Sequence, residues 1–159
     1  MFRNLGPYIY RPQPIVINFL GRTILMIKGL NHIGIVVKDI DETMALFSRI
    51  FGAKEIGRKT FAELGQTSAL ISIGDMKIEL MAPYGDKGVV PDFLKKRGEG
   101  LHHISVITDD IDAEDEHLAK NGVNVLGKAP KGIKDDRVMF THPKQTNGIV
   151  FEIVEPIKK

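Results

Sequence analysis

The chain has 159 residues, 43% hydrophobic and 26% charged, with a formal net charge of +2 at pH 7. This is ordinary globular usage with enough apolar material for a core, and so small a charge gives no reason to expect nucleic acid as a partner. No cysteine is present, which excludes disulfides, zinc held by thiolates and a cysteine nucleophile, so a metal would need nitrogen and oxygen ligands. No apolar run approaches the ~20 residues of a membrane span. We therefore expect a soluble, cytoplasmic protein without a membrane partner.

Residues 1–26 are interpreted as an N-terminal extension, because they fit neither copy of a repeat that fills the rest of the chain. The stretch GLNHIGIVVKDID, which starts at Gly29, recurs from Gly100 as GLHHISVITDDID, and the ends of the two halves also match. A self-match of this kind indicates that one structural unit is used twice. We predict a single domain over residues 27–156, with repeats at 27–84 and 100–156 and a linker at 85–99.

In the first copy, the β-branched run over residues 32–37 predicts a strand. Asp39 or Asp41 is expected to cap a helix that ends at Gly52. The runs 68–73 and 77–81 predict two strands joined by the hairpin signal at 74–75. The linker is expected to hold a short helix that ends near Gly98.

The second copy repeats this plan. We predict strands at 103–108, 123–126, 137–141 and 149–154, and a helix that Asp110 or Asp112 caps and that ends at 121–122. Each half is therefore β-α-β-β-β. The predicted fold class is α+β, with two tandem βαβββ modules forming a curved sheet around a central cleft and helices on one side.

Two histidines and two glutamates occupy equivalent positions of the two copies: His32, Glu79, His103 and Glu152. Each alternates with apolar neighbours in its strand, so we expect all four to face away from the helix-packed side. A single histidine or glutamate that alternates with apolar residues in a strand usually just faces water. Two imidazoles and two carboxylates in one cleft, however, would raise one another's electrostatic cost unless a cation lies between them. Two nitrogens and two oxygens suit a first-row divalent ion such as Co²⁺, Mn²⁺, Ni²⁺ or Zn²⁺. By the same alternation, His102 should point away from the cleft.

Four stretches of the chain resemble the methylmalonyl-CoA epimerases, a family of the vicinal oxygen chelate superfamily, to which glyoxalase I and the extradiol dioxygenases also belong. They are NHIGI from Asn31, ELMAP from Glu79, FLKKRGEGLHHI from Phe93, and THPK from Thr141 with the following GIVFE from Gly148. The FLKKRGEGLHHI stretch and the His-Pro-Lys before the last glutamate are the most particular to this family. The resemblance covers residues 27–156.

The resemblance implies a paired βαβββ fold with one divalent metal, Co²⁺ first among the candidates, on His32, Glu79, His103 and Glu152. It implies an acyl-CoA substrate, and we expect a homodimer. The family interconverts (R)- and (S)-methylmalonyl-CoA by removing and returning the C2 proton through a metal-stabilised enolate. Glu152, as a ligand that can also take a proton, would be the catalytic base on one face.

The chain departs from some epimerases at Ser68, where those relatives carry a second glutamate. A serine cannot act as a carboxylate base, so the second base and the range of acyl-CoA substrates stay open. Two alternatives also stay open. Glyoxalase I, a lactoylglutathione lyase, uses a similar ligand set, and some members of the superfamily bind small molecules without chemistry. An extradiol dioxygenase would leave Glu79 without a role.

Overall fold

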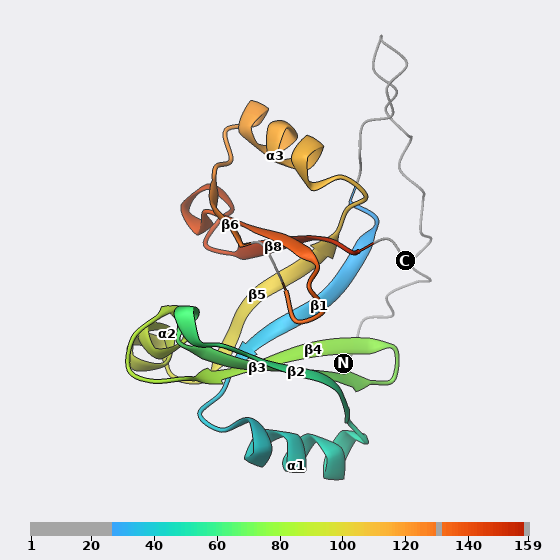
Figure 1. Cartoon of the computed structure of the whole chain (residues 1–159), viewed down its shortest axis with the longest axis vertical. Coiled ribbons are helices and arrows are strands. Elements are labelled where there is room, and N and C mark those ends of the chain that lie inside the picture. The colour runs from blue at the N-terminus through green and yellow to red at the C-terminus, as the bar shows by residue number, and fades with distance from the viewer. Residues whose placement is uncertain (1–26, 130–131, 158–159) are drawn as a thin grey trace, which may run out of the picture.

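The structure, a computed structural model, describes residues 27–129 and 132–157 (Figure 1). These residues form one eight-stranded sheet in the order β2-β3-β4-β1-β5-β8-β7-β6. The extension predicted at residues 1–26 lies outside the described residues.

Each half of the described chain follows the βαβββ plan. The first half contains β1 (Gly29–Val36), α1 (Ile40–Phe51), β2 (Lys54–Phe61), a 3₁₀ turn (Ala62–Leu64), β3 (Gln66–Ile73) and β4 (Met76–Pro83). Helix α2 (Val89–Arg97) follows. The second half contains β5 (Gly100–Ile107), α3 (Ile111–Lys120), β6 (Val125–Ala129), β7 (Arg137–Thr141), a 3₁₀ turn (Pro143–Gln145) and β8 (Val150–Glu155). The predicted fold class is confirmed.

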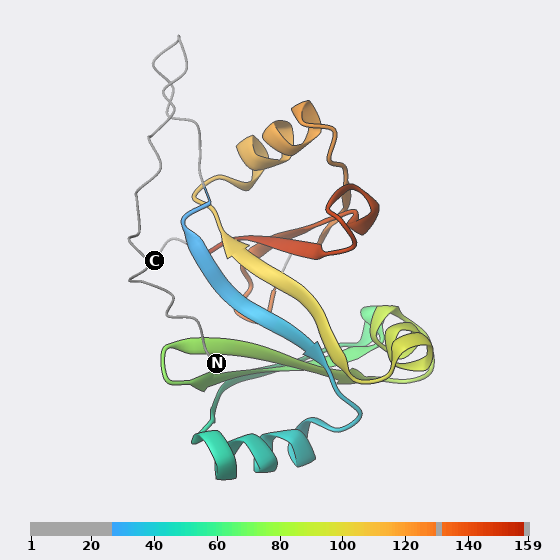
Figure 2. The ribbon, with the colours of Figure 1, turned by 180° about the vertical axis from the view of Figure 1, so that it is seen from behind.

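The two halves meet at the centre of the sheet, where β1 and β5 pair antiparallel. Within each half, the first strand pairs parallel with the last: β1 with β4, and β5 with β8. Figures 1 and 2 show β2–β4 and β6–β8 as two layers, with β1 and β5 running diagonally between them. The curved sheet therefore encloses a concave space between equivalent strands of the two halves.

Aspartates begin both helices of the repeat. The Asp39 side chain accepts a hydrogen bond from the Glu42 N–H at 2.9 Å, and the Asp110 side chain accepts one from the Ala113 N–H at 3.0 Å. These bonds satisfy amides that have no partner within the helix. Gly52 ends α1 with φ 67°, a left-handed conformation that glycine adopts without strain. Of the two aspartates that were candidates for each helix, the first one, Asp39 or Asp110, is the N-cap.

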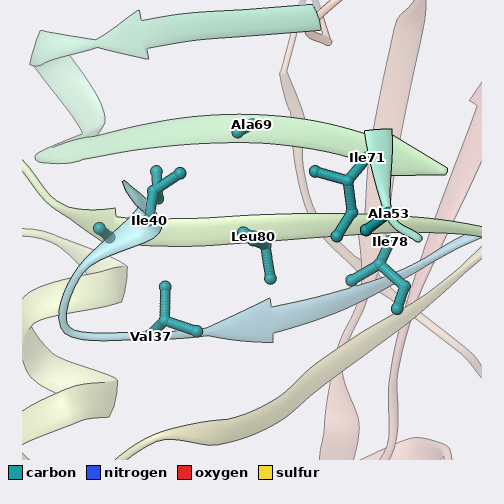
Figure 3. Packing of buried hydrophobic residues seen from close by; sticks show 8 residues of the cluster. Val37, Ile40, Ala53, Ala69, Ile71, Ile78 and Leu80 are labelled. Atoms are coloured by element: carbon teal, nitrogen blue, oxygen red, sulfur yellow. The ribbon is translucent and has the colours of Figure 1, made fainter. Parts of the chain in front are cut away.

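The larger core cluster lies between α1, which contributes Ile40, Met44 and Phe47, and the outer face of the first half. Figure 3 shows its buried side chains. Leu80 and Ile71 are fully buried in it, and Val37 and Ile40 are 5% exposed. A matching cluster under α3 contains Ile111, Met139 and Ile153. Figures 1 and 2 show α1 and α3 on opposite outer sides of the sheet. Because these clusters occupy the outer face, polar side chains of alternate parity face the concave space.

Helix α2 departs from the expectation that the helices cover one side of the sheet. Its residue Val90 packs with Val36 of β1 and Met81 of β4, and all three are at most 2% exposed. Val36 and Met81 lie two residues beyond Gly34 and Glu79, and so on the same face as these. Helix α2 therefore covers one end of the concave face.

Strand β2 is the element that the sequence did not localise. Its sequence, KEIGRKTF, is rich in charge, and most of its residues are exposed or half-buried. As an edge strand, β2 pairs on one side only, with β3. Charged side chains are typical of strand edges, where they discourage pairing with other chains, so the apolar alternation that marks a central strand is weak here.

Candidate metal centre

The four central strands bring the four predicted residues to one place. His32 lies on β1, Glu79 on β4, His103 on β5 and Glu152 on β8, and each is 4–8% exposed. The register of the strands explains why the four residues converge. In each half, one residue of the first strand pairs with a candidate histidine on one side and with a candidate glutamate on the other. Gly34 pairs with both Glu79 and His103, and Ser105 pairs with both His32 and Glu152.

The donor atoms of these side chains lie close together. The Nε2 atoms of the two histidines are 3.1 Å apart. His32 Nε2 lies 3.3 Å from Glu79 Oε2 and 3.2 Å from Glu152 Oε2. The corresponding distances from His103 Nε2 are 3.4 Å to Glu79 and 3.8 Å to Glu152. Four side chains from four strands therefore aim donor atoms at a common point.

These distances fit a divalent ion. Metal–nitrogen and metal–oxygen bonds of about 2.1 Å, set at right angles, place two donor atoms roughly 3.0 Å apart, and wider angles separate them further. Glu152 Oε2 is buried and has no hydrogen-bond partner, although His32 Nε2 is near it. A buried carboxylate oxygen without a hydrogen bond, close to an imidazole nitrogen, is an arrangement that suits metal ligands. The candidate ligand atoms of His32, His103 and Glu152 lie within 4.8 Å of one another. Glu79 Oε2 adjoins that group, within 3.4 Å of Nε2 of both histidines.

The two carboxyl groups differ in their electrostatics. Burial favours the protonated form of both, and it raises the pKa of Glu152 above the usual range, with the Glu79 charge adding to the effect. For Glu79, the adjacent imidazoles of His103 and His32 outweigh burial and hold the pKa below its usual range. Burial alone would lower the pKa of His103, but Glu79 and Glu152 raise it. The pKa values of the equivalent glutamates of the two halves are therefore shifted in opposite directions.

Gly34 makes room for the His103 imidazole. A Cβ atom at residue 34 would overlap the Cε1, Nδ1 and Nε2 atoms of that ring. The second half has Ser105 at the equivalent position, and its side chain is fully buried. Aligning the two copies of the repeat places Gly34 and Ser105 at equivalent positions. The alignment did not predict that these two residues form the floor of the site, which we define as the two strand positions that pair with the candidate histidines and glutamates.

The prediction that His102 points away from the cleft is wrong. His102 lines the central cavity, and its Nδ1 lies 3.0 Å from Nδ1 of His103. The pairing of β1 with β5 changes register at this point, so His102 is an extra residue in β5, a β-bulge that re-aims its side chain. Burial, with the nearby His103 as a second cause, lowers the pKa of His102 to about 4.

Ser68 is not among the residues that line the cavity. It is fully buried on β3 and accepts a hydrogen bond from Gln66 Nε2 at 3.1 Å. Neither its chemistry nor its position suits a base.

The four candidate metal-binding residues lie in the wall of a large cavity on the concave face. Its volume is about 1320 Å³, and much of its wall is apolar, with Leu70, Val138 and Phe140 among the lining residues. Lys59 also lines it and contacts the loop of the second half, at 2.8 Å from Asp135 Oδ1. The cavity can hold an organic ligand much larger than the reacting group at the metal centre.

Comparison with known proteins agrees with this fold and site. A family model described as the Glyoxalase/Bleomycin resistance protein/Dioxygenase superfamily matches residues 31–140. The mitochondrial methylmalonyl-CoA epimerase of Dictyostelium discoideum is 35% identical over 140 residues, which cover 87% of this chain and 83% of the relative. The ethylmalonyl-CoA/methylmalonyl-CoA epimerase of Cereibacter sphaeroides is 35% identical over 131 residues, 80% of this chain and 98% of the relative.

Solved structures show the same relationship. The methylmalonyl-CoA epimerase of Mycobacterium tuberculosis superposes with a TM-score of 0.79 at 30% identity, covering 83% of this chain and 90% of that one. A methylmalonyl-CoA epimerase in complex with methylmalonyl-CoA and NH4+ gives a TM-score of 0.77 at 30% identity, with coverage of 81% and 94%. The chain belongs to the glyoxalase/bleomycin resistance protein/dioxygenase superfamily and, within it, to the methylmalonyl-CoA epimerases, which are isomerases.

Among the described residues, no helix has both the length and the apolar character needed to cross a bilayer.

Proposed function

We propose that the protein interconverts (R)- and (S)-methylmalonyl-CoA by removing and returning the proton at C2. The observation that carries this proposal is the convergence of His32, Glu79, His103 and Glu152 at the wall of a cavity of about 1320 Å³. A relative of the same fold has been solved with methylmalonyl-CoA, which supports an acyl-CoA as the substrate.

The four converging residues are proposed to hold one divalent ion, with Co²⁺ first among the candidates and Mn²⁺, Ni²⁺ or Zn²⁺ as the others. Their two nitrogens and two carboxylates suit a first-row ion. When bound, the ion supplies Lewis-acid stabilisation of the negative charge that develops on the substrate oxygens. Metal analysis of the purified protein, followed by reloading with each ion, tests the ligand set and the choice of metal.

Glu152 is the proposed base for one face of the substrate carbon. It lies in the cavity wall, and its buried Oε2 has no hydrogen-bond partner in the protein. Inversion at C2 needs proton transfer on both faces of a planar intermediate. Ser68 does not supply the second group, because it is a hydroxyl buried outside the cavity wall. A different cavity group, or a water, must serve the opposite face.

Exchange of the C2 proton in deuterated water, measured separately from each enantiomer of methylmalonyl-CoA, tests the proposal. Wild-type protein should exchange both. Glu152→Gln keeps an oxygen ligand of nearly the same shape but cannot accept the proton. Exchange should therefore fall by about 10²–10⁴-fold, while metal binding weakens only moderately. If metal-loaded Glu152→Gln exchanges both enantiomers at the wild-type rate, Glu152 is not the base. Lactoylglutathione lyase activity without exchange into methylmalonyl-CoA would favour the glyoxalase alternative.

A homodimer and a cytoplasmic location are further parts of the proposal. The central strands carry Leu30 and Leu101, which are 54% and 71% exposed and could be covered by a second copy. Light scattering across a range of concentrations tests the dimer, and fractionation of source cells tests the location.

A further inference from the structure

Both central strands carry a β-bulge immediately before the histidine that faces the metal centre. In β1, Leu30 pairs with Val106 but His32 pairs with Ser105, so Asn31 is an extra residue. In β5, the same register change leaves His102 as an extra residue before His103. Asn31 and His102 also align in the two copies of the repeat. The bulge is therefore a feature of the duplicated unit rather than an irregularity of one strand.

Each bulge residue contacts the same ring atom of the histidine that follows it. Asn31 Oδ1 lies 3.2 Å from Nδ1 of His32, and His102 Nδ1 lies 3.0 Å from Nδ1 of His103. The opposite ring atoms, the two Nε2 atoms, face each other at 3.1 Å across the metal centre. Two chemically different side chains thus make the same contact in the two halves.

The chemistry of a ligand histidine explains what this contact can do. A neutral imidazole has one N–H donor and one acceptor nitrogen, and the acceptor is the atom that binds a metal. If Nε2 is the ligand atom, Nδ1 carries the proton and needs an acceptor. The amide oxygen of Asn31 is an acceptor, and so is Nδ1 of His102 in the neutral tautomer that carries its proton on Nε2. The His102 ring is itself packed edge-on against Phe93 of α2, with centroids 5.1 Å apart.

We propose that Asn31 and His102 are equivalent positioning residues, each of which accepts a hydrogen bond from the Nδ1–H of the next histidine and so aims Nε2 at the metal. This inference rests on the metal centre of the proposed function and adds two residues to it. It also gives helix α2 a role in the site, because Phe93 in its second turn packs against the His102 ring.

The duplicated unit supplies the test, because each half contains the substitution that should rescue the other. His102→Asn keeps an acceptor of the kind found at residue 31, whereas His102→Leu removes it at similar bulk. The Co²⁺ dissociation constant is measured by competition with a chelator, without substrate. His102→Leu should weaken binding by about 10–100-fold, and His102→Asn should stay close to wild type. Asn31→Leu and Asn31→His should behave in the same way. His117, exposed on α3, provides the matched control pair His117→Leu and His117→Asn, with no expected change.

The inference is overturned if His102→Leu binds Co²⁺ as tightly as wild type, or if His102→Asn loses as much affinity as His102→Leu. Long-range ¹H–¹⁵N NMR of the Zn²⁺-loaded protein gives a second reading, in which the ligand histidines should be protonated at Nδ1. A proton on Nε2 would overturn the inference as well. Wild-type protein that binds Co²⁺ but exchanges no C2 proton would contradict the proposed function alone, because the affinity series does not depend on turnover.

Discussion

At the scale of single residues, the site depends on which side chain occupies each position of the floor. Residues 34 and 105 are equivalent in the repeat, and each pairs with one histidine and one glutamate of the site. The absence of a side chain at Gly34 lets the His103 imidazole lie directly over the strand. Ser105, which pairs with His32 and Glu152, instead carries a buried hydroxyl. The duplicated unit has therefore become asymmetric at its centre.

Gly34→Ala should weaken metal binding without unfolding the protein. The new methyl group would occupy the space of the His103 ring, which must swing away from the other donor atoms. We expect the Co²⁺ dissociation constant to rise by at least the 10–100-fold typical of disturbed ligand positioning. Titration with Co²⁺ measures it, and circular dichroism checks the fold. Gly29→Ala, where a Cβ meets no atom within 4 Å, is the matched control on the same strand. Equal affinities in the two variants would contradict the role of Gly34.

At the scale of elements, the two equivalent helices α1 and α3 differ in the polarity of the face that packs against the sheet. In α1 this face is apolar, with Ile40, Met44 and Phe47 packed in the core cluster. In α3, Ile111 and Leu118 pack inward, but Glu114 between them is only 3% exposed. Its buried Oε1 has no hydrogen-bond partner, and burial raises the pKa of its carboxyl. A buried charge of this kind destabilises the folded state.

Glu114→Gln should therefore stabilise the protein at neutral pH. Burial raises the pKa of Glu114 in the folded state, so at neutral pH ionisation of this carboxyl is less favourable in the folded state than in the unfolded one, and folding carries that cost. That cost decreases as the pH falls and is gone below the unfolded value of about 4.3, where the carboxyl is protonated in both states. The gain from Glu114→Gln should be largest near pH 7 and vanish in acid. Chemical denaturation at several pH values measures it, with the exposed neighbour Glu116→Gln as control. A gain that does not depend on pH would show that charge burial is not the cause.

At the scale of the whole molecule, neither half contains the complete donor set. His32 and Glu79 come from the first half, and His103 and Glu152 from the second. The halves are joined by the antiparallel pairing of β1 with β5, directly beneath the site. A bound ion would therefore hold the two halves of the sheet together, and it would remove the repulsion between the buried carboxylates.

Metal removal should accordingly lower the melting temperature. A ligand that binds only the folded state stabilises it by about 2.7 kcal/mol at a hundredfold excess over its dissociation constant. We expect a higher melting temperature in Co²⁺ than in chelator, as measured by differential scanning calorimetry. His103→Ala, which removes one donor from the second half, should largely abolish the difference. A wild-type melting temperature that is the same in Co²⁺ and in chelator would contradict the metal centre.

Much of this architecture follows from the sequence alone. The repeat, the capping aspartates at residues 39 and 110 and the alternation around Glu79 and Glu152 are local patterns, and the structure contains them. Because the side-chain period of a strand is two, alternation suffices to place a residue on one face. Duplication then indicates that equivalent residues meet. These two arguments grouped four donor residues that the fold does bring together.

Tertiary structure alone decided the rest. The side chain of His102 turns into the cleft because β1 and β5 change register there, and a bulge depends on the pairing of strands far apart in the sequence rather than on either strand's own pattern. The position of α2 on the concave face depends in the same way on contacts of Val90 with Val36 and Met81. Local periodicity determines which residues share a face of a strand; only the pairing between strands determines where a face is interrupted and what covers it.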